Sequence, residues 1–135
     1  MALDCVLIDT ITSNEKANYR SIFSSCKLAQ TARGDLWITE QQSCLNFRYR
    51  SSPAGYESDW HVAGDPTLII ISSGCLEIEL RDGSRKRFTA GNKFIAEDFL
   101  PPQHPFDPQS HGHRARVPGR EEFSAIHIKL SKRIA

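Results

Sequence analysis

The sequence has no long hydrophobic run and no strong charge of either sign. Its longest apolar runs, such as Leu68–Ile71, are far shorter than the ~20 residues that a membrane-spanning helix needs. Seventeen Lys and Arg residues stand against 16 Asp and Glu, a formal net charge of +1, which speaks against nucleic-acid binding by bulk electrostatics. Asp4 and Asp9 flank the apolar residues near the N-terminus, and no basic start precedes them, so we predict no signal peptide. We therefore expect a cytoplasmic protein with neither membrane nor nucleic acid as a partner.

Closely spaced cysteines are also missing. The four cysteines stand at positions 5, 26, 44 and 75, without a Cys-x-x-Cys pair. An even number would suit two disulfides in an exported chain, but in a cytoplasmic one we expect free thiols that pack as small apolar side chains.

What the chain has in abundance, from Asp35 onward, is the alternation typical of strands. Leu45, Phe47 and Tyr49 alternate with polar residues, as in a sheet with two unlike faces. Thr67–Ser72 is β-branched and apolar, which suits a strand buried on both sides. A turn at Asp82-Gly83 and further short strands are expected at Leu76–Leu80, Arg87–Thr89, Asn92–Ala96, Ala115–Val117 and Phe123–Leu130. This series predicts one all-β sandwich or barrel.

The N-terminal part differs from this pattern. Ser13–Ser25 has a helix opening, with Ser13 or Asn14 as the cap and Glu15 in the first turn. We therefore predict an N-terminal extension over residues 1–34, with a strand and a short helix, followed by a β-barrel over residues 35–135.

A proline-rich segment interrupts the strands. Leu100–His111 holds four of the seven prolines, and proline cannot donate to a strand ladder. We predict a loop insertion over residues 99–112. It is either a lid over the mouth of the barrel or a tolerated surface insertion.

One set of spacings points to a family. Gly55 is followed by five residues and then His61, and Gly74 stands 13 positions after His61. This spacing resembles the first motif of the cupins, a family of RmlC-like jelly-roll barrels. The second histidine position of that motif holds Ala63, and its glutamate position holds Thr67. Two of the three metal-binding side chains of the motif are therefore missing.

The second cupin motif is similarly altered. The segment from Phe88 to Asp98 resembles its strand-turn-strand, with Gly91 at the turn. His113 best matches the motif's histidine if the proline-rich loop is an insertion. An alignment without a gap would place His104 there, but the strand-like residues after His113 favour the later position. The asparagine position of the motif holds Val117.

Shorter elements are similar to those of a subgroup of small single-domain cupins. These elements are Pro53-Ala54-Gly55-Tyr56, Trp60-His61-Val62-Ala63, Ala96-Glu97-Asp98 and Gly112-His113. The resemblance implies an antiparallel jelly-roll barrel with a degenerate metal-binding motif. It implies no single reaction, because one barrel supports many chemistries.

The resemblance leaves the metal question open. Cupin metal centres use several convergent ligands, and only His61 and His113 remain at matching positions. They would bind a divalent transition metal if one more donor joined them. Otherwise they are hydrogen-bonding residues of a metal-free pocket. The side chains able to supply that donor are Glu97, Asp98, His104 and His111.

Without a metal, the two histidines can still move protons. A neutral imidazole with a pKa near ~6.5 takes up or releases a proton at cellular pH. We predict His61 and His113 as proton-handling residues and Asp98 as the carboxylate that orients one of them. Trp60 is expected to pack in the core rather than stack on a substrate. Tyr56 either lines the entrance or belongs to a turn.

The direction of two strand faces remains open. His127 enters the pocket if its face of the last strand points inward, and is an ordinary solvated histidine if it points outward. Arg48 and Arg50 would bind an anionic substrate if they point inward. If they point outward, they pair with surface acids such as Glu77 or Glu79.

These observations favour a small-molecule-binding cupin that acts as an isomerase, dehydratase or lyase on a small oxygenated metabolite. His61, His113 and Asp98 are the predicted catalytic residues, with Tyr56, Arg48, His127 and His104 as predicted pocket residues. Two alternatives stay open: a non-catalytic ligand carrier or sensor, and a metal-dependent oxygenase with a rearranged ligand set. We expect a homodimer, with the apolar Val6–Ile8 segment as a strand donated to the partner.

Overall fold

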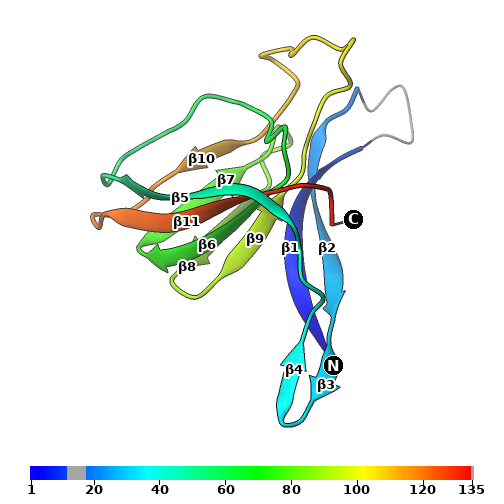
Figure 1. Ribbon diagram of the computed structural model, residues 1–135. Coiled ribbons are helices and arrows are strands. Elements are labelled where there is room, and N and C mark those ends of the chain that lie inside the picture. Colours follow the sequence, from blue (N-terminus) through cyan, green and yellow to red (C-terminus); the bar gives the residue numbers. More distant parts are fainter. Residues whose placement is uncertain (12–17, 135) are drawn as a thin grey trace.

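The computed structural model describes residues 1–11 and 18–134, which form eleven strands and no helix. One sheet has six strands in the order β2-β1-β9-β6-β11-β5, and a second has three in the order β10-β7-β8. A separate hairpin of two strands lies beyond the long β1–β2 ribbon (Figure 1). The bounds are β1 (Ala2–Thr10), β2 (Ser21–Ala29), β3 (Thr31–Arg33), β4 (Leu36–Ile38), β5 (Cys44–Ser52), β6 (Thr67–Ser73), β7 (Cys75–Glu79), β8 (Arg85–Thr89), β9 (Lys93–Ala96), β10 (Arg114–Arg116) and β11 (Phe123–Leu130).

The main hydrophobic core lies between the two larger sheets. Apolar side chains alternate along the strands, so each strand directs every second residue into this core. Ile69 and Ile71 enter it from β6, and Ile78 and Phe88 enter it from β7 and β8. The predicted all-β fold is confirmed. The two sheets are not closed into a barrel by hydrogen bonds between the described strands.

The six-stranded sheet is also partly covered on its other face. Leu7, Ile95 and Leu130 form a second buried cluster there, which Ile134 of the C-terminal segment contacts. Leu68 on β6 packs partly against the same cluster. The central strands of this sheet are therefore apolar on both faces, as the Thr67–Ser72 pattern indicated.

The predicted helix over Ser13–Ser25 is wrong where the structure describes it. Residues 21–25 belong to β2, whose nine residues all pair with β1, while residues 13–17 lie outside the described part of the chain. Asn18 and Tyr19 have φ angles of 51° and 54°. This left-handed geometry reverses the chain into β2 and is incompatible with a continuous right-handed helix. No helix that could cross a membrane occurs among the described residues.

The first strand is integrated into the large sheet. Val6–Ile8 pairs in parallel with residues 94–96 of β9 in the same chain, while β2 pairs along its other side. All other strand pairs are antiparallel. Val6–Ile8 is thus already paired within one chain. The edges of this sheet are β2 and β5.

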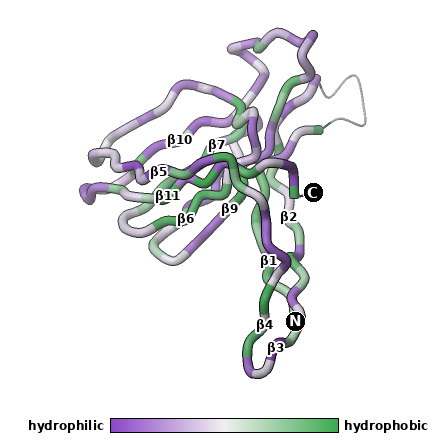
Figure 2. The backbone as a smooth tube through the Cα atoms, viewed as in Figure 1, coloured by the Kyte–Doolittle hydropathy of each residue, from purple (hydrophilic) through white to green (hydrophobic). Residues whose placement is uncertain are grey.

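The proline-rich segment contains no strand, as predicted, and runs as a largely hydrophilic loop between β9 and β10 (Figure 2). Its conformation is fixed by polar contacts. Arg81 donates hydrogen bonds to the carbonyl oxygens of Pro108 and His111 at 2.7 and 2.8 Å. The buried His111 ring accepts the Asp107 N–H at Nδ1 and donates from Nε2 to the Asn18 carbonyl, both at 2.8 Å. These contacts fasten the loop to the turn before β2.

Candidate functional site

A close backbone approach brings the two candidate histidines together. His61 and His113 form a bridge pair in which each N–H donates to the other's carbonyl at 2.9 Å. Gly112 permits this contact because its φ is +86° and a Cβ at that position would lie 2.5 Å from the His61 carbonyl oxygen. The imidazole centroids are 4.5 Å apart. The predicted Gly-His element therefore has a physical reason: no larger residue than glycine fits before His113.

Asp98 holds His113 in one orientation. Its carboxylate is fully buried, and its Oδ2 lies 2.7 Å from His113 Nδ1 and 2.7 Å from Ser21 Oγ. Its Oδ1 accepts the backbone N–H of Ala63 at 3.0 Å. Because an ionised carboxylate only accepts hydrogen bonds, Nδ1 of His113 carries the proton. The Nε2 lone pair is then the one available to a ligand.

His61 is held in the same tautomer by a different partner. Its Nδ1 lies 2.8 Å from the carbonyl oxygen of Asp59, which can only accept, so Nδ1–H donates. Although His61 is exposed toward the cavity, the surrounding protein displaces enough water to lower the pKa of its imidazole, and nearby His113 adds to the effect. His61 is therefore neutral at pH 7 and also has a free Nε2.

Trp60, beside His61, packs with cations rather than in the core. The guanidinium carbons of Arg81 and Arg114 lie 3.9 and 4.9 Å from the centroid of its ring. These distances fit cation–π contacts. Arg81 also holds the proline-rich loop, so Trp60 links that loop to the segment between β5 and β6 that carries His61.

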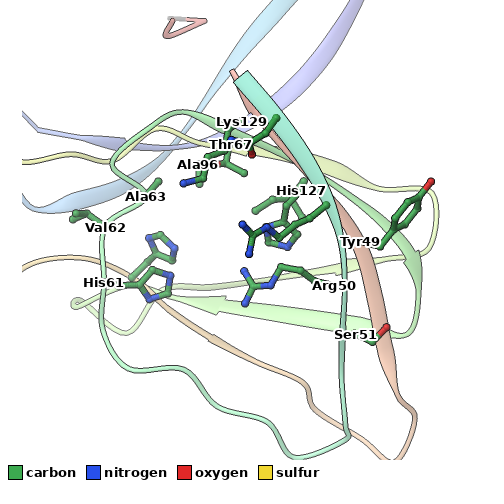
Figure 3. A pocket seen from close by; sticks show the side chains of 14 residues that line it. Tyr49, Arg50, Ser51, His61, Val62, Ala63, Thr67, Ala96, His127 and Lys129 are labelled. Carbon is green, nitrogen blue, oxygen red and sulfur yellow. The ribbon is translucent and has the colours of Figure 1, made fainter. Parts of the chain in front are cut away.

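Both histidines line a cavity of about 670 Å³, which we call the central cavity (Figure 3). The opposite wall comes from β5, β11 and β6. In Figure 3, Arg50 and His127 point into the space that His61 faces, whereas Tyr49 points away from it. The residues that line the cavity are Asn46, Arg48, Tyr49, Arg50, Ser51, His61, Val62, Ala63, Thr67, Ile69, Ala96, His113, His127 and Lys129.

The strand faces left open by the sequence point inward. Arg48 and His127 are direct partners across β5 and β11, and both line the central cavity. Partial burial and the charges of Arg50 and Arg48 lower the pKa of His127 to about 4. His127 is therefore a neutral imidazole at pH 7, facing His61 and His113 across the cavity.

The outward alternative, in which Arg48 and Arg50 pair with surface acids such as Glu77 or Glu79, is wrong. The two glutamates bind arginines of the other sheet instead, because β7 lies between β8 and β10. The Arg116 and Arg87 side chains donate to Glu77 and hold the pKa of this buried carboxyl below its usual value. The pairs among the described residues are Arg85–Glu77, Arg85–Glu79, Arg87–Glu77, Arg114–Glu79 and Arg116–Glu77.

Two other predicted pocket residues lie in different places. Tyr56 lines a smaller pocket of about 70 Å³ that shares Arg50, His61 and His127 with the central cavity. His104 lies on the exposed proline-rich loop, with its ring 4.6 Å from that of Tyr19. Among the described residues, none from 99–112 lines either space. In this structure the loop therefore forms no part of the wall of either space.

The donor set does not fit a cupin metal centre. No group of three or more His, Cys, Asp or Glu side chains suited to a metal occurs in the described parts of the chain. Asp98 uses both oxygens in hydrogen bonds behind His113. Its neighbour Glu97 faces the other side of the sheet, where it accepts the Ile134 N–H at 2.5 Å. Ala63 and Thr67 line the cavity at the positions where the cupin motif has ligands.

Sequence reasoning missed Ser21 and Lys129 as site residues. The capping pattern places Ser21 in a helix, so nothing in the sequence connects it with Asp98, 77 residues later. Lys129 shares the alternation of His127 along the last strand, so the same period-two argument could have found it.

Comparisons with known proteins find similar chains among solved structures. No family model and no curated protein matches the chain. A cupin-2 domain protein from Shewanella frigidimarina is 20% identical, with 62% of this chain and 68% of that one covered and a TM-score of 0.46. A Cupin 2 conserved barrel domain protein from Salinispora arenicola is 24% identical, with 61% of this chain and 59% of that one covered and a TM-score of 0.44. The Cnp3 cupin domain of Schizosaccharomyces pombe is 10% identical, with 97% of this chain and 88% of that one covered and a TM-score of 0.49. The chain is similar to small cupin domains in fold.

Proposed function

We propose that this protein binds a small oxygenated metabolite in the central cavity and catalyses an acid–base isomerisation, dehydration or lyase reaction on it. One observation carries the proposal. His61 and His113 each keep a proton on Nδ1 through a fixed acceptor, which leaves two Nε2 lone pairs beside each other at the cavity wall.

The two histidines have different partners and therefore different tasks. When His113 takes a proton at Nε2, the Asp98 carboxylate at 2.7 Å stabilises the imidazolium. We therefore assign to His113 the removal of a proton from a C–H bond next to a carbonyl group. His61 has only a carbonyl oxygen as its partner, and it handles the proton of the adjacent hydroxyl group. General acid–base catalysis of this kind contributes ~10²–10⁴-fold in rate.

Solvent isotope exchange tests the proposal across a whole class of substrates at once. A panel of hydroxy acids, oxo acids and short sugars is incubated with the protein in D₂O and followed by proton NMR. An acid–base enzyme replaces a C–H proton of its substrate with deuterium, so one signal should disappear with time. If no panel member that binds shows exchange, the catalytic proposal fails and the non-catalytic carrier or sensor remains.

Two conservative variants locate the exchange. His113→Asn and His61→Asn keep an N–H near the position of Nδ1 and remove Nε2. Exchange should fall by at least ~10²-fold in each, while the fold is preserved. His104→Asn is the matched control, since it removes an exposed histidine outside the cavity. Equal exchange in all three variants would contradict the assignment.

We also propose a homodimer that works in the cytoplasm. Large apolar side chains are exposed on β4 and at alternate positions of β5, and β5 is a sheet edge (Figure 1). Exposed edges and apolar patches are typical of association surfaces. The exposed residues are Leu36, Trp37, Ile38, Leu45, Phe47 and Tyr49, with Tyr49 76% exposed. A monomer in light scattering would contradict the dimer. The four free cysteines suit a reducing compartment.

A further inference from the structure

We infer that the ligand of the central cavity is a small organic anion whose carboxylate or phosphate group binds Arg48, Arg50 and Lys129. The inference deepens the proposed function and rests on it for the position of the ligand. It concerns equilibrium binding, however, so it can be tested separately from turnover.

Strand register gathers the cations on one wall. On β5 and β11, Arg48 lies opposite His127, which in turn lies opposite Ile69 on β6. One row away, Lys129 lies opposite Thr67. All five residues line the central cavity. Each row therefore runs from cationic and polar groups near the β5 edge to neutral groups on β6.

These cations lack a counter-charge. The residues that line the central cavity include no Asp or Glu. Among the described residues, Arg48, Arg50 and Lys129 form no ion pair with a carboxylate. The arginines of β8 and β10 behave differently, because Glu77 and Glu79 neutralise them. Three cations without a carboxylate partner among the described residues therefore line the same cavity.

The state of His127 supports this interpretation. Its pKa falls to about 4 because of partial burial and because Arg50 and Arg48 oppose a further positive charge. A site with this excess of positive potential stabilises an anion, and a neutral ligand would leave the cations unpaired. Guanidinium groups also match the planar geometry of two oxygens of a carboxylate or phosphate.

The rest of the cavity sets the size and polarity of the ligand. Ile69 adds an apolar side chain to the lining, and His61 lies across the space from Arg50 and His127 (Figure 3). A fitting ligand has an anionic group at the β5 side and a short carbon body over Ile69. A hydroxyl or carbonyl group at its other end reaches the histidines. Small hydroxy or oxo acids and small phosphate esters have this arrangement.

Binding of simple probes tests the anion site. Malonate and inorganic phosphate are titrated into the full chain at low ionic strength, with calorimetry and NMR shifts as readouts, and malonamide serves as the neutral match of malonate. We expect malonate, phosphate or both to bind, and malonamide to bind at least ~10-fold more weakly. The stronger of the two anions identifies the ligand as a carboxylate or a phosphate ester. Equal binding of malonamide and malonate would overturn the inference.

Charge-removing variants place the site. Arg48→Gln and Arg50→Gln change exposed side chains, so the fold should persist, and each should weaken anion binding at least ~10-fold. Arg33→Gln removes the same charge from the exposed β3–β4 hairpin and should change binding less than ~2-fold. If all three variants bind like the wild type, or all weaken equally, the cavity is not the anion site.

The two proposals fail in different ways. His61→Asn and His113→Asn should retain anion binding and lose isotope exchange. Anion binding without exchange in the wild type would support the anion site and contradict catalysis. Exchange of a neutral sugar, with no binding of malonate or phosphate, would support catalysis and contradict the anion site.

Discussion

Asp98→Asn is the most informative single substitution, because it reverses the proton position on His113. In the wild type, Asp98 accepts from the Ala63 N–H with one oxygen and from Ser21 and His113 with the other. An asparagine keeps the first bond if its carbonyl oxygen faces Ala63. Its NH₂ group then faces His113 Nδ1 and can only donate. His113 must therefore carry its proton on Nε2, and the lone pair toward the cavity is lost.

The opposite orientation of the asparagine is less favourable. It would place the NH₂ group against the Ala63 N–H, leaving a buried donor unsatisfied at a cost of about 1–3 kcal/mol. In the preferred orientation, the hydrogen bonds of the charged Asp98 carboxylate are replaced by hydrogen bonds of a neutral amide. We therefore expect a stability loss of about 1.5–3 kcal/mol, or roughly 5–15 °C in Tm for a chain of this size. Isotope exchange should fall by ~10²–10⁴-fold.

Long-range ¹H–¹⁵N NMR spectra of the imidazole rings distinguish a protonated nitrogen from an unprotonated one. The wild-type His113 should be the Nδ1–H tautomer and the Asp98→Asn variant the Nε2–H tautomer. Ser21→Ala is the control: it removes one bond to the same carboxylate, costs about 1 kcal/mol and leaves the tautomer unchanged. An Nε2–H tautomer in the wild type, or an Nδ1–H tautomer in Asp98→Asn, would show that Asp98 does not set the proton position.

Stability and thiol reactivity provide three more tests. Gly112→Ala should cost about 2–4 kcal/mol in urea unfolding, since its Cβ meets the His61 carbonyl, whereas Gly119→Ala, at φ +82° in open space, should cost only about 1–2 kcal/mol; equal losses would contradict the close approach. The pKa of His127 is about 4 in the folded protein and ~6.5 in the unfolded chain, so its contribution to stability should be complete above pH 6.5 and decline as the pH falls toward 4. His127→Gln should reduce the dependence of the unfolding free energy on pH in this range, and an unchanged dependence would contradict the lowered pKa. Burial, together with Cys26 nearby, raises the Cys5 pKa to about 11. At pH 8 its thiolate fraction, and with it its rate of reaction with a disulfide reagent, should therefore be ~100-fold below that of a thiol with a pKa of 9.0. Rapid reaction of all four thiols would contradict this.

Local sequence was a reliable guide wherever a strand alternates in polarity. The alternation along residues 45–49 and 123–130 predicted β5 and β11, because side-chain direction in a strand has a period of two. The same rule failed to say which face looks into the cavity. That choice depends on which sheet lies opposite the strand, and the side chains on both faces of β5 are largely exposed within the single chain.

The N-terminal region shows the opposite case. Capping residues near Ser13 predicted a helix, but β2 forms because β1 offers it a complete ladder of nine residue pairs. The pairing partner outweighs a weak local preference. This error also concealed Ser21, whose bond to Asp98 exists only because β2 runs beside the site.

Residue type and spacing were enough to predict the all-β character of this protein and the glycine before His113. These are local properties, set by side-chain chemistry and backbone freedom. Which charges meet became clear only from the folded chain. There, Glu77 and Glu79 pair with arginines of β8 and β10, and Arg48, Arg50 and Lys129 stay without a carboxylate partner around the central cavity among the described residues. The pairs across the β7–β8 hairpin join residues close in sequence, but the pairs with β10 join residues 35 and 39 positions apart. Distances of that second kind are not encoded by spacing along the sequence.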